Sequence, residues 1–284
     1  MTSVAAAVEA LVGALRGRRV AVLTGAGCST ESGIPDYRGP ETRARARNPI
    51  EYRAFVNDPA ARRRYWSRSL VGWPRIRVAE PNAAHRALAE LEAAGVLAGL
   101  VTQNVDRLHT RAGSAAPVEL HGALAEVRCL ACRAVVARDA LQARLLADNP
   151  TLGEARASEV APDGDATLEV DLDAFVVPAC ESCGGVLKPD VVFFGEAVPV
   201  ERVRRSEAIV DQAEAMLVVG SSLAVYSGLR FVRRAAARGL PCVLLNLGPP
   251  ERGAECFSLH VDAPAGEVLA LTARVLPGEL AVGG

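Results

Sequence analysis

The chain of 284 residues lacks any stretch of eighteen consecutive apolar residues, although half of its residues are hydrophobic. A helix that crosses a membrane needs about 20 such residues, so we expect no membrane span and no membrane partner. The first segment, Met1–Arg16, also lacks the basic start, apolar run and cleavage site of a secretory signal. We therefore expect a cytoplasmic protein.

An excess of charge of one sign is also missing. The 32 basic and 33 acidic residues give a net charge of -1, which provides no general attraction to nucleic acid, and we expect no direct nucleic-acid binding. Arginines do crowd residues 43–68, but a solvated basic helix explains them at least as well as a polyanion site. Without repeats or low-complexity linkers, a chain of this length predicts one large domain.

Short β-branched runs alternate with alanine- and leucine-rich helical segments, which is typical of parallel βαβ units. The predicted strands are Arg19–Thr24, Leu97–Thr102, Met216–Gly220 and Cys242–Leu247. The predicted helices are Ala83–Ala94, Val200–Ala213 and Tyr226–Arg238. This pattern predicts an α/β fold with a Rossmann-like, doubly wound parallel sheet, which binds ligands beyond the carboxyl ends of its strands.

Two stretches interrupt the alternation and predict a smaller lobe formed by two insertions. Residues 39–77 are rich in arginine and aromatic side chains and read as helical, and residues 123–185 hold four cysteines and an acidic loop. The large lobe would comprise residues 1–38, 78–122 and 186–284 of a single domain. We expect the active site in the groove between the lobes.

The cysteines of the second insertion form two Cys-x-x-Cys pairs, Cys129/Cys132 and Cys180/Cys183. Two such turns close a tetrahedral thiolate shell around one zinc ion and leave no position open for water, so we predict one structural Zn²⁺. Disulfides or a redox dithiol are the alternatives, and a reducing cytosol disfavours disulfides. Three further cysteines lie outside this set: Cys28, Cys242 and Cys256.

A glycine turn, Gly25-Ala26-Gly27, follows the first predicted strand. Missing side chains would let its backbone N–H groups approach a pyrophosphate, although a plain strand-to-helix turn also fits. The dehydrogenase fingerprint requires a further glycine or alanine where Thr30 stands. A hydride-transferring Rossmann enzyme is therefore disfavoured.

Seven motifs, in order along nearly the whole chain, resemble those of the sirtuin (Sir2-like) family, the NAD-dependent protein-lysine deacylases. They are Gly25–Arg38, Thr102–His109, Glu119–Gly122, the two cysteine pairs, Lys188–Glu196, Gly220–Ser222 and Asn246–Gly248. Arg64–Arg68, Val71–Pro74 and residues 161–165 resemble its class II subgroup, which includes a mitochondrial member of animals. The chain departs from the family at Cys28, where a branched aliphatic is usual, and after Asn246, where an acidic residue often follows two places on.

The resemblance implies an enzyme that consumes NAD as co-substrate, moves the acyl group of an acyl-lysine protein to ADP-ribose, and releases nicotinamide, which also inhibits. It implies that His121 takes a proton from a ribose hydroxyl and that Asn104 assists in the nicotinamide pocket. A histidine titrates near neutral pH and suits proton transfer. The implied NAD-binding residues are Gly25, Ala26, Gly27, Asp36, Tyr37, Arg38, Gln103, Asn104, Val105, Asp106, Gly220, Ser221, Ser222, Asn246, Leu247, Gly248 and Cys256.

The resemblance also implies that the extended segment 191–196 pairs with the substrate backbone as an added strand, although an ordinary buried strand fits as well. Its substrate-contacting residues would be Val191, Val192, Phe193, Phe194 and Gly195. Tyr65 and Arg68 share one helix face, where a guanidinium can bind an acyl chain that ends in a carboxylate. Arg68 fits equally well on the solvated side of a basic helix.

Two plainer interpretations stay open at this point. Asn104 and Asp106 follow a strand, where such side chains commonly cap the next helix. The NAD pocket would also serve a protein mono-ADP-ribosyltransferase or a non-catalytic NAD or ADP-ribose sensor, but the presence of both His121 and Asn104 argues against a sensor.

Overall fold

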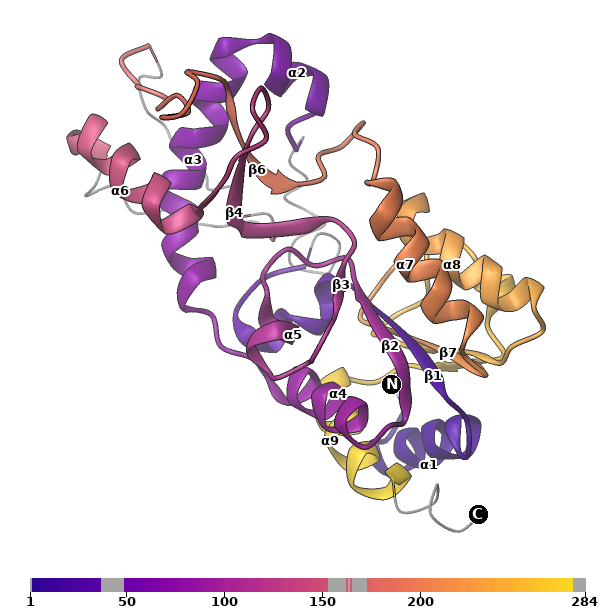
Figure 1. Cartoon of the computed structure of the whole chain (residues 1–284). Coiled ribbons are helices and arrows are strands. Elements are labelled where there is room, and N and C mark those ends of the chain that lie inside the picture. The colour runs from indigo at the N-terminus through magenta and orange to yellow at the C-terminus, as the bar shows by residue number, and fades with distance from the viewer. Residues whose placement is uncertain (1, 37–48, 153–161, 163, 165–172, 278–284) are drawn as a thin grey trace.

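The computed structural model describes residues 2–36, 49–152, 162, 164 and 173–277. These residues form a six-stranded parallel sheet with the strand order β3-β2-β1-β7-β8-β9 (Figure 1). Its strands are β1 (Val20–Thr24), β2 (Leu97–Thr102), β3 (Val118–Glu119), β7 (Ala215–Val219), β8 (Cys242–Leu245) and β9 (Leu259–Val261). The order is that of doubly wound dinucleotide-binding sheets, in which the connections reverse between the two central strands. Here those strands are β1 and β7.

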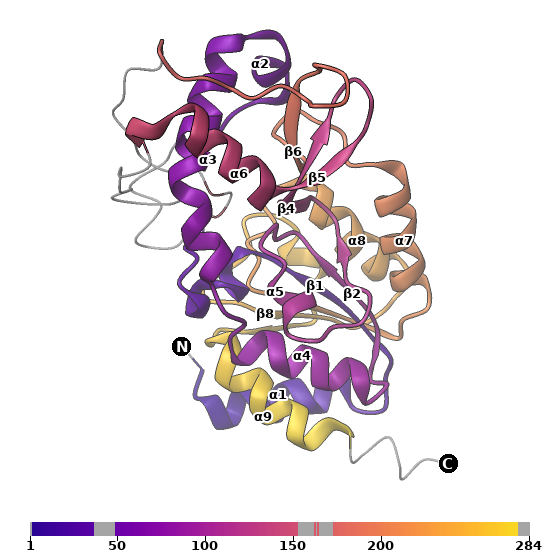
Figure 2. The same cartoon turned by 60° about the vertical axis from the view of Figure 1, so that its left-hand side comes forward.

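Helices cover both faces of this sheet, as Figures 1 and 2 show. One face packs against α1 (Val4–Leu15), α4 (Ala83–Ala93) and α9 (Ala265–Val275), and the other against α7 (Val200–Asp211) and α8 (Tyr226–Ala237). Alternate residues of β1 face the two cores, Val20 and Val22 on one side and Ala21 and Leu23 on the other. Burial on both faces explains why the central strands are continuous apolar runs in the sequence.

The second lobe holds a three-stranded antiparallel sheet in the order β5-β4-β6, at the top of Figure 1. Its strands are β4 (Gly122–Cys129), β5 (Val135–Ala137) and β6 (Leu187–Val191), and its helices are α2 (Tyr52–Asn57), α3 (Pro59–Val78) and α6 (Arg138–Asp148). Asp58 caps α3 by accepting a hydrogen bond from the Ala60 amide, and Pro59 occupies the first helical position. A separate core of aromatic and aliphatic side chains joins these elements.

Short helical turns lie in the loops that follow β1, β2 and β8: η1 (Ala26–Cys28), η2 (Thr30–Ser32), α5 (Leu108–Arg111) and η5 (Ala254–Cys256). A further turn, η4 (Pro150–Leu152), follows α6. None of the described helices is long and apolar enough to cross a membrane, as expected.

The predicted strands and helices of the parallel sheet are confirmed within two residues at each end. The prediction of one extended segment from Val191 to Glu196 is wrong in its length. Strand β6 ends at Val191, and beyond it Phe194 makes an isolated bridge to Glu51 before a turn at Gly195, where φ is +76°. The Glu196 carboxylate accepts a hydrogen bond from the Phe193 amide at 2.9 Å, which curls the segment back on itself.

Candidate active site

The glycine turn after β1 lies against the loop after β7, at the point where the sheet order reverses. The Gly27 amide donates to the Gly220 carbonyl at 2.8 Å, and a Cβ built on Gly25 would lie 2.7 Å from the Cβ of Ser221. The glycines therefore let two loops of the protein meet, in addition to any approach to a ligand. Gly220 itself has φ +59°, which also favours glycine.

The predicted nicotinamide motif after β2 forms a buried polar network with this turn. Asn104 donates from Nδ2 to the Gly25 carbonyl and to the Ser29 hydroxyl, both at 3.0 Å. Ser29 in turn donates to Asp106 at 2.7 Å. Burial raises the pKa of Asp106, while its bonds from the Leu108 amide and Ser29 oppose that rise. Asn104 and Asp106 thus hold fixed orientations before any ligand arrives.

The capping interpretation of this motif also holds in part. Asp106 accepts from the Leu108 amide at 2.9 Å, at the start of α5, and so caps that turn with one carboxylate oxygen. Its other oxygen accepts from Ser29. Gln103 extends the network toward the β7 loop, because its Nε2 donates to the Ser221 hydroxyl at 2.9 Å.

His121 lies directly before β4 and is held through both ring nitrogens. Nδ1 is 3.0 Å from the Gln103 carbonyl and Nε2 is 2.8 Å from the Ser227 hydroxyl. A carbonyl only accepts, so Nδ1 carries the proton and Nε2 offers a lone pair. Burial lowers the pKa of His121 and nearby Arg202 adds to this, against the bond to Gln103. The ring is therefore a neutral base near neutral pH.

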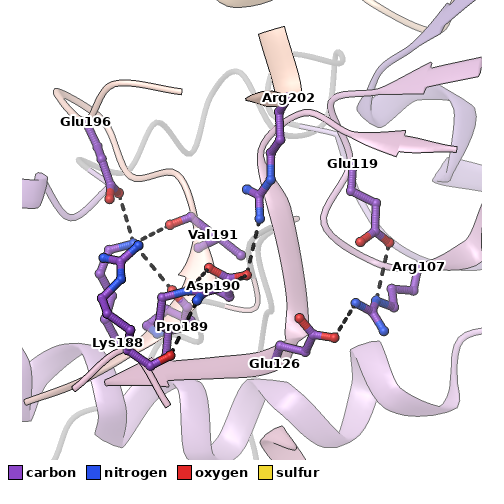
Figure 3. Close-up of polar contacts among 11 residues, drawn as sticks. Arg107, Glu119, Glu126, Lys188, Pro189, Asp190, Val191, Glu196 and Arg202 are labelled. Atoms are coloured by element: carbon purple, nitrogen blue, oxygen red, sulfur yellow. Dashed lines mark hydrogen bonds and ion pairs between the residues drawn. The ribbon is translucent and has the colours of Figure 1, made fainter. Parts of the chain in front are cut away.

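The predicted substrate segment begins beside this histidine, since the Val192 amide donates to the His121 carbonyl at 2.8 Å. Val191 and Phe193 are buried, whereas Phe194 and Gly195 are exposed. Figure 3 shows how the segment is fixed: Lys188 reaches the Glu196 carboxylate at 2.9 Å and donates to the Val191 carbonyl. Glu196 thus binds both a buried ammonium and the Phe193 amide, so the turn holds its shape from within.

A set of ion pairs links β6, the strand that leads into this segment, to β4 and to α7 (Figure 3). Asp190 accepts two hydrogen bonds from Arg128, at 3.0 and 3.1 Å, and one from Arg202 at 3.2 Å. These arginines hold the pKa of Asp190 below its usual range, against the effect of its burial. Arg107 bridges Glu119 and Glu126, so the strands on either side of His121 are also tied together.

The predicted adenosine-side residues follow β8. Asn246 donates from Nδ2 to the Leu247 and Gly248 carbonyls, both at 2.9 Å, and the Leu247 side chain is exposed. The Glu251 amide donates to the Ser222 carbonyl at 2.8 Å, and this bond holds the loop before η5 beside the loop that follows β7. Cys256 is the last residue of η5. Asp36 is half-buried. Tyr37 and Arg38 lie outside the residues that the structure describes.

Tyr65 belongs to an aromatic cluster at the second lobe rather than to an open surface. Its ring centroid lies 5.2 Å from that of Phe193 in the substrate segment and 5.5 Å from that of Phe55. Arg68 lies one turn along α3 and is half-buried. The structure thus brings Tyr65 beside the substrate segment but leaves the role of Arg68 a prediction.

The four cysteines of the second lobe converge as predicted. Their sulfur atoms all lie within 4.8 Å of one another, with Cys129 and Cys183 at 3.5 Å and Cys132 and Cys180 at 3.8 Å. Tetrahedral zinc with Zn–S bonds of about 2.3 Å places its sulfurs about 3.8 Å apart, so this cluster fits a structural zinc ion. The Cys132 amide lowers the pKa of the Cys129 thiol, which favours the thiolate that zinc requires. All seven cysteines of the chain are free.

Sequence reasoning missed three polar side chains of this site. Ser29 connects Asn104 to Asp106, Ser227 faces the base nitrogen of His121, and Asp262 accepts from the Gly248 amide at 3.0 Å. Asp262, directly after β9, supplies an acidic group near Asn246, at the place where the sequence motif lacks one. Serines are too common for any local signal to have singled out the other two.

A doubly wound sheet, polar side chains at its switch point and a thiolate zinc cluster together define a nucleotide-binding enzyme. The model of the Sir2 family matches residues 25–227, and the chain belongs to this family.

Curated relatives are similar over most of the chain. An NAD-dependent protein deacetylase of Xanthomonas campestris is 54% identical over 256 residues, which are 90% of this chain and 87% of the relative. One of Bordetella bronchiseptica is 52% identical over 92% of this chain and 96% of the relative. Among solved structures, a complex of Sir2 with a p53 peptide and NAD⁺ has a TM-score of 0.70 at 28% identity, covering 97% of this chain and 99% of the other. A Sir2 homologue bound to NAD has a TM-score of 0.71 at 30% identity, covering 96% and 94%.

Proposed function

We propose that this protein is an NAD-dependent protein-lysine deacylase that transfers the acyl group of an acyl-lysine to ADP-ribose. The observation that carries the proposal is the placement of His121, a neutral base bonded through its ring to the nicotinamide motif and through its carbonyl to the substrate segment. The names of the relatives, NAD-dependent protein deacetylases at 52% and 54% identity, support the same reaction.

Each group of residues would contact a different part of NAD. Asn104 and Asp106, fixed through Ser29, would recognise the nicotinamide carboxamide, which needs both a donor and an acceptor. The loops at Gly25–Gly27 and Gly220–Ser222 would hold the phosphates, and Asn246 to Gly248 the adenosine side. NAD supplies a ribose carbon from which nicotinamide departs. His121 Nε2 would take the proton of a ribose hydroxyl, with Ser227 exchanged for that hydroxyl as its partner.

The substrate protein would add an extended strand beside the segment from Val191 to Gly195, since main-chain hydrogen bonds give affinity with little demand on sequence. Lys188 and Glu196 fix the shape of that segment before binding. We place the enzyme in the cytoplasm and, from the residues of α3, in the class II subgroup. Nicotinamide would act as product and inhibitor.

Mass spectrometry of the products tests the proposal against its two rivals. A deacylase yields O-acyl-ADP-ribose and nicotinamide in equal amounts from an acyl-lysine peptide and NAD. Protein mono-ADP-ribosyltransfer instead adds the mass of ADP-ribose to the protein, and a sensor leaves NAD unchanged. Either of these results without O-acyl-ADP-ribose would refute the proposed reaction.

We also propose a preference for acyl chains that end in a carboxylate, read by Arg68 beside Tyr65. The support is the contact of Tyr65 with Phe193 of the predicted substrate segment, which would bring α3 close to a bound acyl-lysine. Rates on acetyl-, succinyl- and glutaryl-lysine peptides should be compared in the wild type, in Arg68→Met and in the control Arg64→Met, which changes an exposed arginine of the same helix. Losing a charge-assisted pair of about 1.5–3 kcal/mol should slow acidic acyl groups by roughly 10- to 100-fold in Arg68→Met alone. Equal loss on acetyl-lysine would contradict this role.

A further inference from the structure

A second group of sulfur and nitrogen ligands is buried next to the Ser29 network. Cys28 of η1, His85 of α4 and His109 of α5 each place a possible ligand atom within 4.8 Å of the other two. Their exposed fractions are 1%, 0% and 2%. The two imidazole rings are 4.7 Å apart, centroid to centroid. The proposed deacylation uses none of these three side chains.

His109 offers an unused lone pair. Its Nε2 is 2.9 Å from the Thr24 hydroxyl, which itself donates to Thr102 at 2.8 Å. Thr24 has a single proton, so Nε2 donates to Thr24 and Nδ1 keeps its lone pair. That Nδ1 atom is buried and has no hydrogen-bond partner. A buried, unpaired acceptor costs free energy unless something binds it.

His85, the second histidine, is held in place by Asn82. The Asn82 Nδ2 donates to the Cys28 carbonyl at 2.8 Å, which fixes the amide with its oxygen toward the histidine. His85 Nδ1 lies 2.9 Å from that oxygen and also accepts a hydrogen bond from the Asn82 backbone amide at 3.3 Å, in the capping box of α4. Its Nε2 lies 3.4 Å from the Ser29 hydroxyl.

Of the two histidines, His109 has the arrangement of a metal-binding imidazole, with one nitrogen donating to an oxygen and the other left open. Burial keeps both neutral, since it lowers the pKa of His85 to about 4 and that of His109 well below its ordinary value. The Cys28 thiol is the soft ligand that favours zinc over harder ions. The negative charges of Asp106 and Glu31 raise the pKa of this thiol beyond the effect of burial, and they would equally attract a cation.

We propose that Cys28, His85 and His109 bind one zinc ion and that its binding inhibits the enzyme. The ion forms one Zn–S and two Zn–N bonds and displaces the thiol proton to solvent, with no change of oxidation state. Ligand atoms around tetrahedral zinc lie roughly 3.3–3.8 Å apart, and the three ligand atoms here already lie within 4.8 Å of one another. The Ser29 hydroxyl, 3.4 Å from His85 Nε2, takes the fourth position, and its movement toward the ion breaks its bonds to Asn104 and Asp106. The metal site stands independently of the proposed function, whereas the inhibition rests on it.

Native mass spectrometry of the full chain, titrated with Zn²⁺ in the absence of NAD and peptide, tests the site. We expect two zinc ions on the wild type, one at the four-cysteine cluster and one at Cys28, and one ion on Cys28→Val. The matched control is Cys242→Val, which removes an equally buried thiol from β8 and should still bind two. The affinity for the second ion should fall on the order of 100-fold or more in Cys28→Val. A wild type that stops at one ion, or a second ion retained by Cys28→Val, would overturn the site.

Co²⁺ gives a second readout in case the valine repacks the region. Co²⁺ is added to protein that carries zinc at the four-cysteine cluster only. It should produce a thiolate-to-cobalt absorption band in the wild type and in Cys242→Val. No band is expected in Cys28→Ser, which keeps the side chain's size. A band that persists in Cys28→Ser contradicts the site. Where deacylation is measurable, added zinc should inhibit the wild type at concentrations about 100-fold lower than Cys28→Val. Equal inhibition of both proteins would refute the link to Ser29.

Discussion

His121 has its two nitrogens in different environments, a carbonyl on one side and a hydroxyl on the other. The base form is the neutral ring, and burial lowers the pKa at which it is lost. Activity should therefore be constant above that pKa and fall as the pH decreases through it. The acid limb of kcat/KM should lie below the ordinary histidine value of about 6.5. An acid limb at pH 7 or higher would be inconsistent with this environment.

Replacing Ser227 by alanine removes the hydroxyl that donates to the neutral ring. A net hydrogen bond of about 1 kcal/mol corresponds to somewhat less than one pKa unit, so the acid limb should move up by that amount. His121→Ala is the control: it should abolish turnover yet leave NAD binding intact by calorimetry. Full deacylation by His121→Ala would remove this residue from the role of base.

Asp106 carries charge at the centre of the nicotinamide motif. In Asp106→Asn the amide oxygen can still cap α5, because it accepts from the Leu108 amide as the carboxylate does. The charged contacts are lost, so turnover and inhibition by nicotinamide should both weaken, by roughly 10- to 100-fold. Inhibition constants measured beside those of Asp211→Asn, an exposed ion-pair variant on α7, check this. Unchanged inhibition by nicotinamide would show that Asp106 does not border its pocket.

Some of the site residues belong to motifs that can be recognised in the sequence, and others do not. Gln103 to Asp106 and His121 belong to contiguous motifs, and the structure brings them together as predicted. Ser227 lies 106 residues beyond His121 along the chain, and a serine near a helix start carries no signal of its own. Its proximity depends on how α8 packs on the sheet, which only the folded chain determines.

At the scale of elements, the close backbone contact between β4 and β6 favours glycine at position 122. A Cβ on Gly122, where φ is +82°, would lie 1.9 Å from the Asp190 carbonyl oxygen. Gly95 has a similar φ of +76° with nothing within 4 Å. Gly95→Ala should cost about 1–2 kcal/mol for backbone strain alone. Gly122→Ala should cost more, since β6 must also move.

Urea denaturation of the two variants measures the difference between their free energies of unfolding. Activity assays show whether the change reaches the site at His121. Displacing β6 disturbs the bond from the Val192 amide to His121, so Gly122→Ala should also lose deacylation, whereas Gly95→Ala should retain it. Equal stability and activity in both variants would show that the crowding at Gly122 is relieved without moving β6.

Strand and helix positions in the parallel sheet were predictable because burial on both faces or on one stripe shows directly in the sequence. The segment after Val191 was not, because its bend depends on a buried ion pair. Lys188 and Glu196 lie eight residues apart in an apolar run, and their contact has no counterpart in any periodic pattern.

For the whole molecule, the zinc cluster joins two distant turns of the second lobe. Structural zinc contributes folding free energy, so Cys183→Ser should release the ion, unfold that lobe and abolish activity indirectly. Cys256→Ser, outside the cluster, should keep the zinc ion of the four cysteines. Metal analysis and hydrogen exchange of β4 to β6 measure both effects. Protein purified without chelator that contains no zinc would contradict the assignment.

The fold class followed from the alternation of elements, but the order of the strands did not. Which strand lies beside β1 is decided by packing between segments far apart in the chain, such as Val20 with Ala215. The pairing of β6 with β4, rather than with the parallel sheet, depends on the same long-range packing.

The position of β1 has a consequence for synthesis on the ribosome. This strand leaves the exit tunnel well before one of its two neighbours, β7, which begins at Ala215. At 5–20 residues per second, roughly 10–40 s pass between the two strands. During that interval an apolar edge of β1 has no native partner and is open to wrong pairing or to chaperones. The sheet edge that becomes the centre of the predicted nucleotide site therefore stays open until β7 has been made, and a nascent chain cannot bind NAD before then.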